Sequence, residues 1–329
     1  MLPVRGRDLT DLLVLAAAWG GSFLFIRLAV PEFGTFPLIT LRVGIATLCL
    51  LPLVILRRKW PEMRRHGRAL FFGGVVNAAL PFTLFAYAAY DLGAGFLAVA
   101  NAVTPAWGGV IGWLWLKDRL PRSSWAGLAL GFGGMLVLVW DKLSFDTDGT
   151  GPAVLAVMLA PLCYGIGANF AKRYLTGVDP LVTTCGSLGG ATLVLLPLCI
   201  AYWPSQPASI QAWGATLLLA TVCTSFAYVI FFRLLATVGP TRAVSVTFLV
   251  PLFGILWGAV LLGEVLSFQL ILGAAIILLG SALVMLGGSG AKAAAAPEVC
   301  PPEPVESIEP LDSIDPTDPN GQNRSRPSD

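Results

Sequence analysis

The chain has 329 residues, of which 56% are hydrophobic and only 12% are charged. A soluble domain covers its surface with polar groups and carries about 25% charged residues. The composition therefore excludes an ordinary soluble protein and predicts an all-α integral membrane protein, because in lipid every backbone polar group must be bonded internally.

Ten apolar runs of about 20 residues follow one another along the chain, each long enough to cross a hydrocarbon core of about 30 Å as a helix. They span residues 9–30, 35–56, 68–89, 94–116, 122–141, 152–174, 180–202, 210–235, 240–262 and 266–287. After them, residues 289–329 are acidic and rich in proline. This tail has too little apolar surface to form a core, so we expect it to be disordered.

The first half of the chain aligns with the second at an offset of 145 residues, and of 146 residues further along. The aligned pairs include Trp19 with Tyr164, Gly20 with Gly165, Arg27 with Lys172, Arg42 with Ser187, Pro105 with Pro251, Gly108 with Gly254 and Asp118 with Glu264. We therefore expect two five-helix repeats, residues 9–141 and 152–288, after a short N-terminal segment of residues 1–8. Because the first run has a counterpart inside the chain, it is predicted to be a retained helix and not a signal peptide.

The charges of the loops predict how the repeats cross the membrane. Residues 57–68 hold six Lys and Arg, whereas the corresponding loop near residues 203–210 has no charge; the loop at 117–122 is basic and its counterpart around Glu264 is acidic. By the positive-inside rule the second repeat is inverted relative to the first. The sequence thus predicts a multi-pass protein of a bacterial inner membrane with both termini in the cytoplasm. Loop charges of this kind do not indicate nucleic-acid binding.

Inverted repeats place a substrate site at their interface, near the middle of the bilayer and beside interrupted helices. Pro105 and Pro251 fall near the centres of the fourth and ninth spans, where each frees the carbonyl four residues earlier, at Asn101 and Thr247. Two interpretations stay open: a kink that opens the backbone to substrate and takes part in gating, and a kink whose carbonyl a neighbouring hydroxyl satisfies.

Polar and aromatic side chains inside the spans are the other candidates for substrate binding, because such groups face protein or a wet cavity. The candidates, with the two residues before the prolines, are Trp19, Ser22, Asn77, Tyr87, Asn101, Tyr164, Asn169, Tyr228 and Thr247. The alternative for each is a contact that only holds two helices together.

Two arginines stand inside the apolar runs. Arg27 lies close to the outer end of the first span, so we expect it to extend to the headgroups as an anchor. Arg42 lies deeper, and either binds a substrate carboxylate or has a structural role; its counterpart Ser187 shows that the repeat does not require the charge.

The chain offers little for catalysis inside the membrane. The single histidine, His66, lies in a basic loop, no Cys-x-x-Cys pair is present, and the acids Asp91, Asp118 and Glu264 stand at the ends of spans. We therefore expect no catalytic residue, no metal and no cofactor. A proton relay would also need a carboxylate at depth.

Several short motifs occur together over residues 9–288. They are Trp19-Gly20-x-Ser22, Pro37-x4-Arg42, the Pro105 and Pro251 segments, and the acidic helix ends Leu116-Lys117-Asp118-Arg119-Leu120 and Leu262-Gly263-Glu264-Val265-Leu266. In this arrangement the chain resembles the EamA family of the drug/metabolite transporter superfamily. The resemblance implies ten helices around a central cavity, lined mainly by helices 1, 3, 4, 6, 8 and 9, with alternating access between the halves. Some members export amino acids; small relatives exchange protons through a glutamate in the first helix, which this chain lacks.

The sequence as a whole predicts a transporter, either an exporter or a facilitator, of small organic metabolites, with amino acids as the favoured class. Its expected partners are a small-molecule solute and the lipid bilayer, and the protein is expected to be a monomer or a weak homodimer. The alternative function is a membrane-embedded enzyme or carrier that acts on lipid or isoprenoid substrates. A purely structural protein is disfavoured, since inverted repeats with central prolines are a transport architecture.

Overall fold

The computed structural model describes residues 6–118, 120–142, 150–239, 243 and 245–294, and for residues 286–294 it describes the backbone alone. Within these ranges the regular elements are helices, in agreement with the predicted all-helical fold class. Most of the connection between the fifth and sixth predicted spans (residues 142–151), and the acidic tail from residue 295 onward, lie outside the described residues.

Nine of the described helical segments are long and apolar enough to cross a membrane, and a tenth apolar helix, α14 (Val246–Leu262), is shorter. Six of the nine are single helices: α1 (Gly6–Phe33), α2 (Thr35–Leu56), α8 (Arg122–Val139), α9 (Gly151–Tyr174), α10 (Pro180–Ala201) and α15 (Phe268–Ala294). All ten occupy the positions expected from the sequence. The α15 helix runs past the predicted end of the repeat at residue 288, and the predicted start of the ninth span at residue 240 lies outside the described residues.

The other three membrane-spanning segments are composite. Residues Gly67–Ala88 comprise α4 (Gly67–Gly74), the π-helix η1 (Val75–Ala79) and α5 (Leu80–Ala88), and residues Ala94–Leu116 comprise α6 (Ala94–Asn101) and α7 (Thr104–Leu116). Residues Ile210–Val238 comprise α11 (Ile210–Ala220), the π-helix η2 (Thr221–Phe226) and α12 (Ala227–Val238). The short α3 (Trp60–Arg65) lies in the basic connection between α2 and α4.

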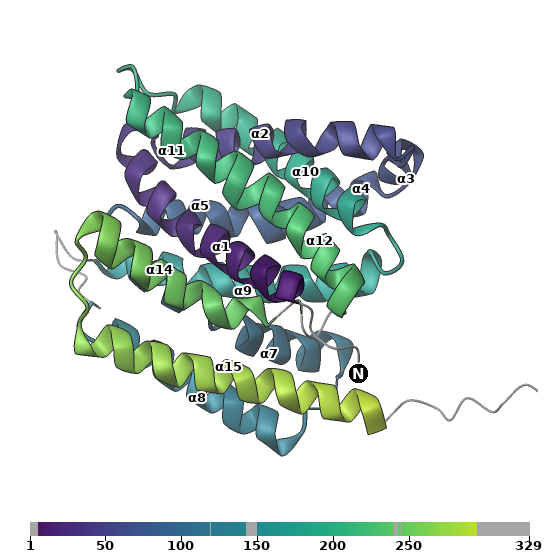
Figure 1. Cartoon of the computed structure of the whole chain (residues 1–329), viewed down its shortest axis with the longest axis vertical. Coiled ribbons are helices and arrows are strands. Elements are labelled where there is room, and N and C mark those ends of the chain that lie inside the picture. The colour runs from purple at the N-terminus through teal and green to yellow at the C-terminus, as the bar shows by residue number, and fades with distance from the viewer. Residues whose placement is uncertain (1–5, 119, 143–149, 240–242, 244, 295–329) are drawn as a thin grey trace, which may run out of the picture. The chain divides into compact units, whose positions relative to one another are not determined.

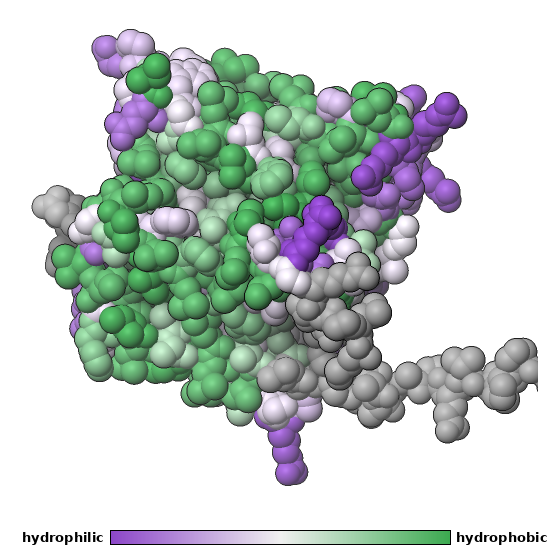
Figure 2. All heavy atoms as spheres, viewed as in Figure 1, coloured by the Kyte–Doolittle hydropathy of each residue, from purple (hydrophilic) through white to green (hydrophobic). Residues whose placement is uncertain are grey.

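The outward faces of the helices are apolar. Large side chains such as Leu48, Leu193, Ile200 and Val260 are exposed along the spans. Figure 2 shows that hydrophobic residues cover most of the visible face, whereas hydrophilic residues gather at helix ends, most clearly on the side where α3 lies in Figure 1. A surface of this kind is solvated by lipid, and the chain is a multi-pass membrane protein.

Helix contacts recur when the two halves are exchanged. The α1 helix packs on α14 and α9 packs on α7; likewise α1 packs on α11 and α12, and α9 packs on α5 and η1. The α2 helix pairs with its counterpart α10, and α8 pairs with α15, side by side along their length (Figure 1). The interior thus repeats one packing scheme twice.

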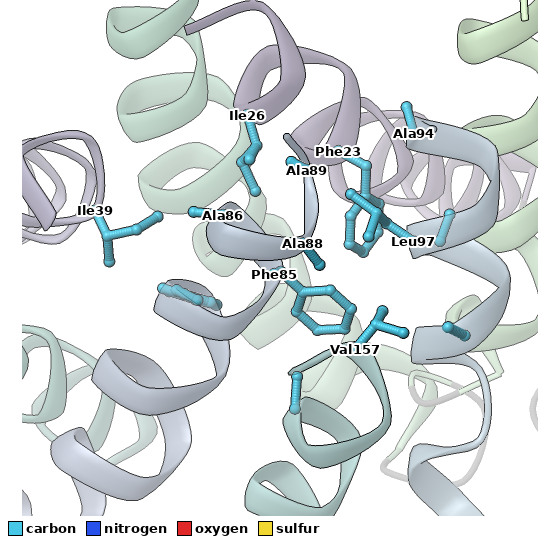
Figure 3. Packing of buried hydrophobic residues seen from close by; sticks show 14 of the residues in the cluster. Phe23, Ile26, Ile39, Phe85, Ala86, Ala88, Ala89, Ala94, Leu97 and Val157 are labelled. Carbon is cyan, nitrogen blue, oxygen red and sulfur yellow. The ribbon is translucent and has the colours of Figure 1, made fainter. Parts of the chain in front are cut away.

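Large and small apolar residues alternate in the core. Figure 3 shows Phe23 of α1, Phe85 of α5, Leu97 of α6 and Val157 of α9 converging beside several alanines. Small residues let the backbones approach, which supplies van der Waals contact between helices that lipid cannot drive together by the hydrophobic effect.

The two π-helices occupy equivalent places. The first begins at Val75 and the second at Thr221, 146 residues later, which is the offset of the repeat. In η2 the hydroxyls of Thr224 and Ser225 donate to the carbonyls of Leu219 and Ala220, five residues earlier, at 2.8 and 2.9 Å. Such π-helical turns are rare and occur often at functional sites, because they turn the following side chains away from the ordinary helical register.

Candidate functional site

Two aligned glycines bring the halves of the protein into close contact at mid-helix. A Cβ atom at Gly20 of α1 would lie 2.8 Å from the Phe253 Cβ atom and 2.9 Å from the Gly254 nitrogen of α14. A Cβ atom at Gly165 of α9 would lie 2.9 Å from the Trp107 carbonyl carbon of α7. Since any larger residue would collide with backbone, both positions need glycine.

The residues just before these glycines begin two matching aromatic groups. Trp19 lies edge-on to Tyr228, with ring centroids 6.1 Å apart and planes at 71°. Its counterpart Tyr164 meets Phe82 in the same manner, at 6.3 Å and 67°. Phe82 precedes Tyr228 by 146 residues, so the Tyr164–Phe82 contact is the equivalent, in the exchanged halves, of the Trp19–Tyr228 contact. The sequence predicted Trp19, Tyr164 and Tyr228 as candidates, and the structure places them in this central region.

A second ring contact of Trp19 and of Tyr164 is also repeated when the halves are exchanged. Trp19 also contacts Phe231, with centroids 5.3 Å apart, and Tyr164 contacts Phe85, with centroids 6.3 Å apart. Phe85 and Phe231 are again separated by 146 residues. We call Trp19, Phe82, Phe85, Tyr164, Tyr228 and Phe231 the central aromatic cluster. Trp19, Tyr164 and Tyr228 keep part of their surface accessible, unlike the alanines packed around them.

Arg42 introduces one positive charge into this cluster. Its side chain is 6% exposed, its Cζ atom lies 3.7 Å from the centroid of the Phe82 ring, and its Nε–H donates to Thr224 Oγ1 at 3.2 Å. Tyr164, Cys223 and Tyr228 lie within range of its electrostatic field. No described carboxylate forms an ion pair with Arg42. A buried guanidinium without a carboxylate partner is costly, so the site is chemically distinctive.

The position equivalent to Arg42 is filled in a different way. The backbone of Ser187 in α10 packs against α4 so closely that a Cβ atom at Gly74 would collide with the Ser187 carbonyl oxygen. The short Ser187 side chain faces Gly73, where a Cβ atom would lie 3.5 Å from its hydroxyl. The positive charge of Arg42 therefore has no counterpart in the second half, although the two halves otherwise repeat each other's contacts.

Ser22 and Asn77 form contacts with other elements or with their own helix. Ser22 is buried, and its hydroxyl is 3.5 Å from the carbonyl of Ala18. Asn77 belongs to η1 and its side chain faces Gly167 of α9, where a Cβ atom would lie 2.8 Å from Asn77 Oδ1. The positions that align with Gly167 and Asn77 are Ser22 and Cys223, which also interact with each other.

Two other predicted candidates lie in different surroundings. Tyr87 is 46% exposed on the surface of α5. Asn169 is buried, and its amide donates to the carbonyl of Gly108 at 3.0 Å and to that of Gly165 at 2.9 Å. Asn169 thus joins α9 to α7, which is the structural alternative that the sequence left open for it.

The two aligned prolines differ in their backbone setting. Pro105 stands at the start of α7, after a break that separates it from α6, and the carbonyl of Asn101 accepts a hydrogen bond from Thr104 Oγ1 at 2.7 Å. Pro251 lies inside the continuous helix α14, near Thr247 in its first turn. In the first half the freed carbonyl is therefore satisfied by a neighbouring hydroxyl.

Charged pairs close the helix ends at two equivalent places. At one end Glu264 accepts hydrogen bonds from the backbone nitrogens of Ala94 (2.6 Å) and Gly95 (3.0 Å), and lies 3.9 Å from Arg27 Nε. At the other end the counterparts of Arg27 and Glu264 form an ion pair, with Lys172 Nζ 2.6 Å from Asp118 Oδ2. Sequence alignment had matched each member of one pair to a member of the other.

Arg27 has partners in the protein at the end of its span. Its Nη1 donates to the carbonyls of Ala89 and Leu92 at 2.5 and 3.1 Å, just past the end of α5. Carbonyls at the end of a helix lack a partner within the helix and favour a cation. That Arg27 anchors the span at the headgroups stays a prediction.

Four residues of this region were not predicted from the sequence: Phe82, Phe85, Phe231 and Thr224. The signal for three of them was present, because the repeat aligns Phe82 with the predicted Tyr228, and Phe85 with Phe231. Thr224 has no such signal, since the π-helix that turns it towards Arg42 leaves no pattern in composition. Among the described residues, no three His, Cys, Asp or Glu side chains are grouped so that they could hold a metal ion.

Comparison with known proteins agrees with this architecture. The sequence profile of the EamA-like transporter family matches the chain twice, over residues 10–140 and 151–286. An uncharacterized transporter of Archaeoglobus fulgidus is 22% identical over 80% of this chain and 92% of its own length. The uncharacterized transporter YwfM of Bacillus subtilis is 25% identical over 84% of this chain and 93% of its own.

Two further matches cover most of the chain. The uncharacterized inner membrane transporter YedA of Escherichia coli is 23% identical over 81% of this chain and 85% of its own. A chain of known crystal structure shares the fold, with a TM-score of 0.61 and 18% identity over 86% of this chain and 98% of its own. The two family matches together cover far more than half of the sequence. The chain therefore belongs to the EamA family of the drug/metabolite transporter superfamily.

Proposed function

We propose that the protein is an exporter or facilitator of small organic metabolites, with amino acids as the favoured class, and that it works by alternating access. The two halves are inverted relative to each other, both termini lie in the cytoplasm, and the substrate binds between the halves at the central aromatic cluster. The protein acts as a transporter and not as an enzyme on lipid or isoprenoid substrates.

The observation that carries this proposal is the pair of equivalent ion pairs at helix ends, Glu264 with Arg27 and Asp118 with Lys172, which we call the two closures. They occupy aligned positions and both join the end of one half to the other half. If the repeats are inverted, these contacts lie at opposite faces of the membrane. A protein with one closure at each face can release them in turn, which is what alternating access requires.

The proposed substrate site comprises Trp19, Ser22, Arg42, Asn77, Asn101, Tyr164, Tyr228 and Thr247. We propose that Pro105 and Pro251 act in gating of the fourth and ninth spans. Aromatic rings and amides suit a solute that has an apolar body and a polar head. Asn169 and Tyr87 stay outside the proposed site, because Asn169 is bonded to backbone and Tyr87 is exposed.

A solute panel in proteoliposomes tests the proposal. The full-length protein is reconstituted, and uptake of labelled amino acids, purines and quaternary amines is measured against empty liposomes. We expect saturable movement of at least one amino acid, which a substitution of Trp19 reduces and a substitution of the exposed Tyr87 leaves unchanged. If no solute of the panel moves through correctly folded protein, or if Tyr87 matters as much as Trp19, the proposal is wrong.

A further inference from the structure

We infer that Arg42 is a binding site for a carboxylate, and that the solute is an organic carboxylate whose apolar body lies against the central aromatic cluster. This inference rests on the proposed function and deepens it. The acid group is the part of the solute that the protein recognises, and an amino group on the solute is dispensable.

The first argument is the unmatched charge of Arg42. A guanidinium has five N–H donors and no acceptor. Among the described residues, only Thr224 supplies an acceptor, at Nε, and the Phe82 ring faces the guanidinium carbon at 3.7 Å. A buried guanidinium is stabilised best by a carboxylate, whose two oxygens match its fork of donors. The protein provides the positive half of such a pair and a solute anion can provide the other half.

The second argument is the distribution of acidic residues. The described carboxylates nearest to the spans belong to Asp11, Glu32, Asp118, Asp179 and Glu264, and each stands at or near the end of a helix. Four of them form ion pairs with a Lys or Arg of another part of the chain: Glu264 with Arg27, Asp118 with Lys172, Asp11 with Arg233 and Asp179 with Lys59. The central aromatic cluster therefore offers a cation for an anionic group, but no described acid for an ammonium group.

The third argument is the asymmetry of the site. The aromatic contacts repeat when the halves are exchanged, yet Arg42 is matched by Ser187, which packs against the glycine-lined face of α4. Packing of the spans is thus achieved in one half without a charge. A purely structural arginine would be expected to serve the same interface in both halves, whereas a substrate with one acid group needs one cation.

The geometry also indicates what else the solute carries. The Arg42 guanidinium lies over one ring of the cluster, and Trp19, Tyr164 and Tyr228 have accessible surface nearby. A carboxylate that bonds to Arg42 would direct the rest of the solute towards these rings. Flat or branched apolar bodies bury the most surface against aromatic side chains.

A charge series with one constant body tests the inference. The probes are 3-phenylpropionate, its neutral amide 3-phenylpropanamide and the cation 3-phenylpropylamine, with dissociation constants measured on the full-length protein in lipid nanodiscs at neutral pH. We expect the carboxylate to bind at least about tenfold more tightly than the amide, because one charge-assisted hydrogen bond contributes enough free energy for that ratio of dissociation constants. The amine is expected to bind most weakly. An amine or amide that binds as tightly as the carboxylate would overturn the inference.

Variants at Arg42 and its counterpart separate recognition from structure. Arg42→Gln should reduce the preference for carboxylate over amide to about twofold or less, and Arg42→Lys should retain part of it, because the charge remains while the fork is lost. The matched control Ser187→Ala should leave the preference unchanged. If Arg42→Gln folds and keeps the preference for carboxylate, Arg42 is structural and the inference is wrong. If that variant does not fold, the comparison of the three probes on the unmodified protein still tests the inference, because an amide or amine that binds as tightly as the carboxylate overturns it.

The outcomes also distinguish this inference from the proposed function. In proteoliposomes, movement of amines or neutral solutes that persists in Arg42→Gln would retain the transporter and refute the carboxylate site. Failure of every labelled solute to move would refute the proposed function, even where 3-phenylpropionate binds.

Discussion

Replacing Glu264 with glutamine should loosen one closure of the protein and leave the other intact. Glu264 bonds to the first two backbone nitrogens of α6, whose preceding residue Gly93 supplies no side-chain cap, and it also faces Arg27. Glutamine keeps one oxygen for a backbone donor but loses the negative charge and the second acceptor. If both termini lie in the cytoplasm, as proposed, this closure faces outward.

The size of the effect follows from the bonds that are lost. A hydrogen bond to a charged group contributes about 1.5–3 kcal/mol, and the Glu264 carboxylate is 20% exposed, so solvent screens it only in part. A loss of this size changes an equilibrium by roughly 10- to 150-fold. The opposite closure is weaker, because Lys172 and Asp118 are 45% and 46% exposed; Asp118→Asn should cost about 0.2–1 kcal/mol.

Labelling of a buried reporter measures this shift. Ser22 of the proposed substrate site is 5% exposed, and we would replace it with cysteine in a protein that lacks its native cysteines. A membrane-impermeant maleimide applied outside should label this cysteine faster in Glu264→Gln, by up to the factor above, and more slowly in Asp118→Asn. An unchanged rate in folded Glu264→Gln, or a faster rate in Asp118→Asn, would refute the assignment of the two closures.

Three further predictions concern other parts of the fold. Pro105→Ala should restore a helical bond at Asn101 and lower transport while thermal stability is kept or raised, as scanning fluorimetry and uptake would show; a fall in both together would indicate a kink needed only for packing. Asn169→Ala should lower the free energy of unfolding by roughly 0.5–2 kcal/mol through loss of the hydrogen bond to the Gly108 carbonyl, and solute affinity should be retained. In the basic connection between α2 and α4, a hydrogen bond from the backbone N–H of Asp179 lowers the pKa of Glu62. The ionised carboxylate therefore stabilises the fold at neutral pH, and this stabilisation is lost as the pH falls through the lowered pKa. Glu62→Gln should reduce the acid sensitivity of the melting temperature.

The positions of the spans could be predicted from the sequence because lipid imposes a simple rule. An apolar run of sufficient length becomes a helix regardless of what it packs against, so runs such as 35–56 and 94–116 have the predicted ends. The sequence could not show that residues 75–79 and 221–226 form π-helices, since a π-helical turn depends on hydroxyl and helix contacts formed in the folded protein.

Contacts among the candidate residues could be predicted where the repeat alignment carried information, and could not where tertiary contacts decide. Trp19 and Tyr164 are aligned and lie at equivalent places. The backbone partners of Arg27 could not be predicted, because its distance from the end of a span says nothing about the carbonyls just past α5 that lie beside it. For Arg42 the sequence left two roles open, and only the contacts of its guanidinium favour one.

Counterflow in proteoliposomes tests the central claim most directly. Vesicles that contain the full-length protein are loaded with unlabelled 3-phenylpropionate and diluted into a trace of labelled 3-phenylpropionate, with no pH gradient and no membrane potential. If one site alternates between the two faces and no carboxylate at depth must titrate, labelled solute should accumulate transiently inside, and Arg42→Gln should abolish the accumulation. Accumulation that appears only with a proton gradient, or that is equal in Arg42→Gln, would contradict the account.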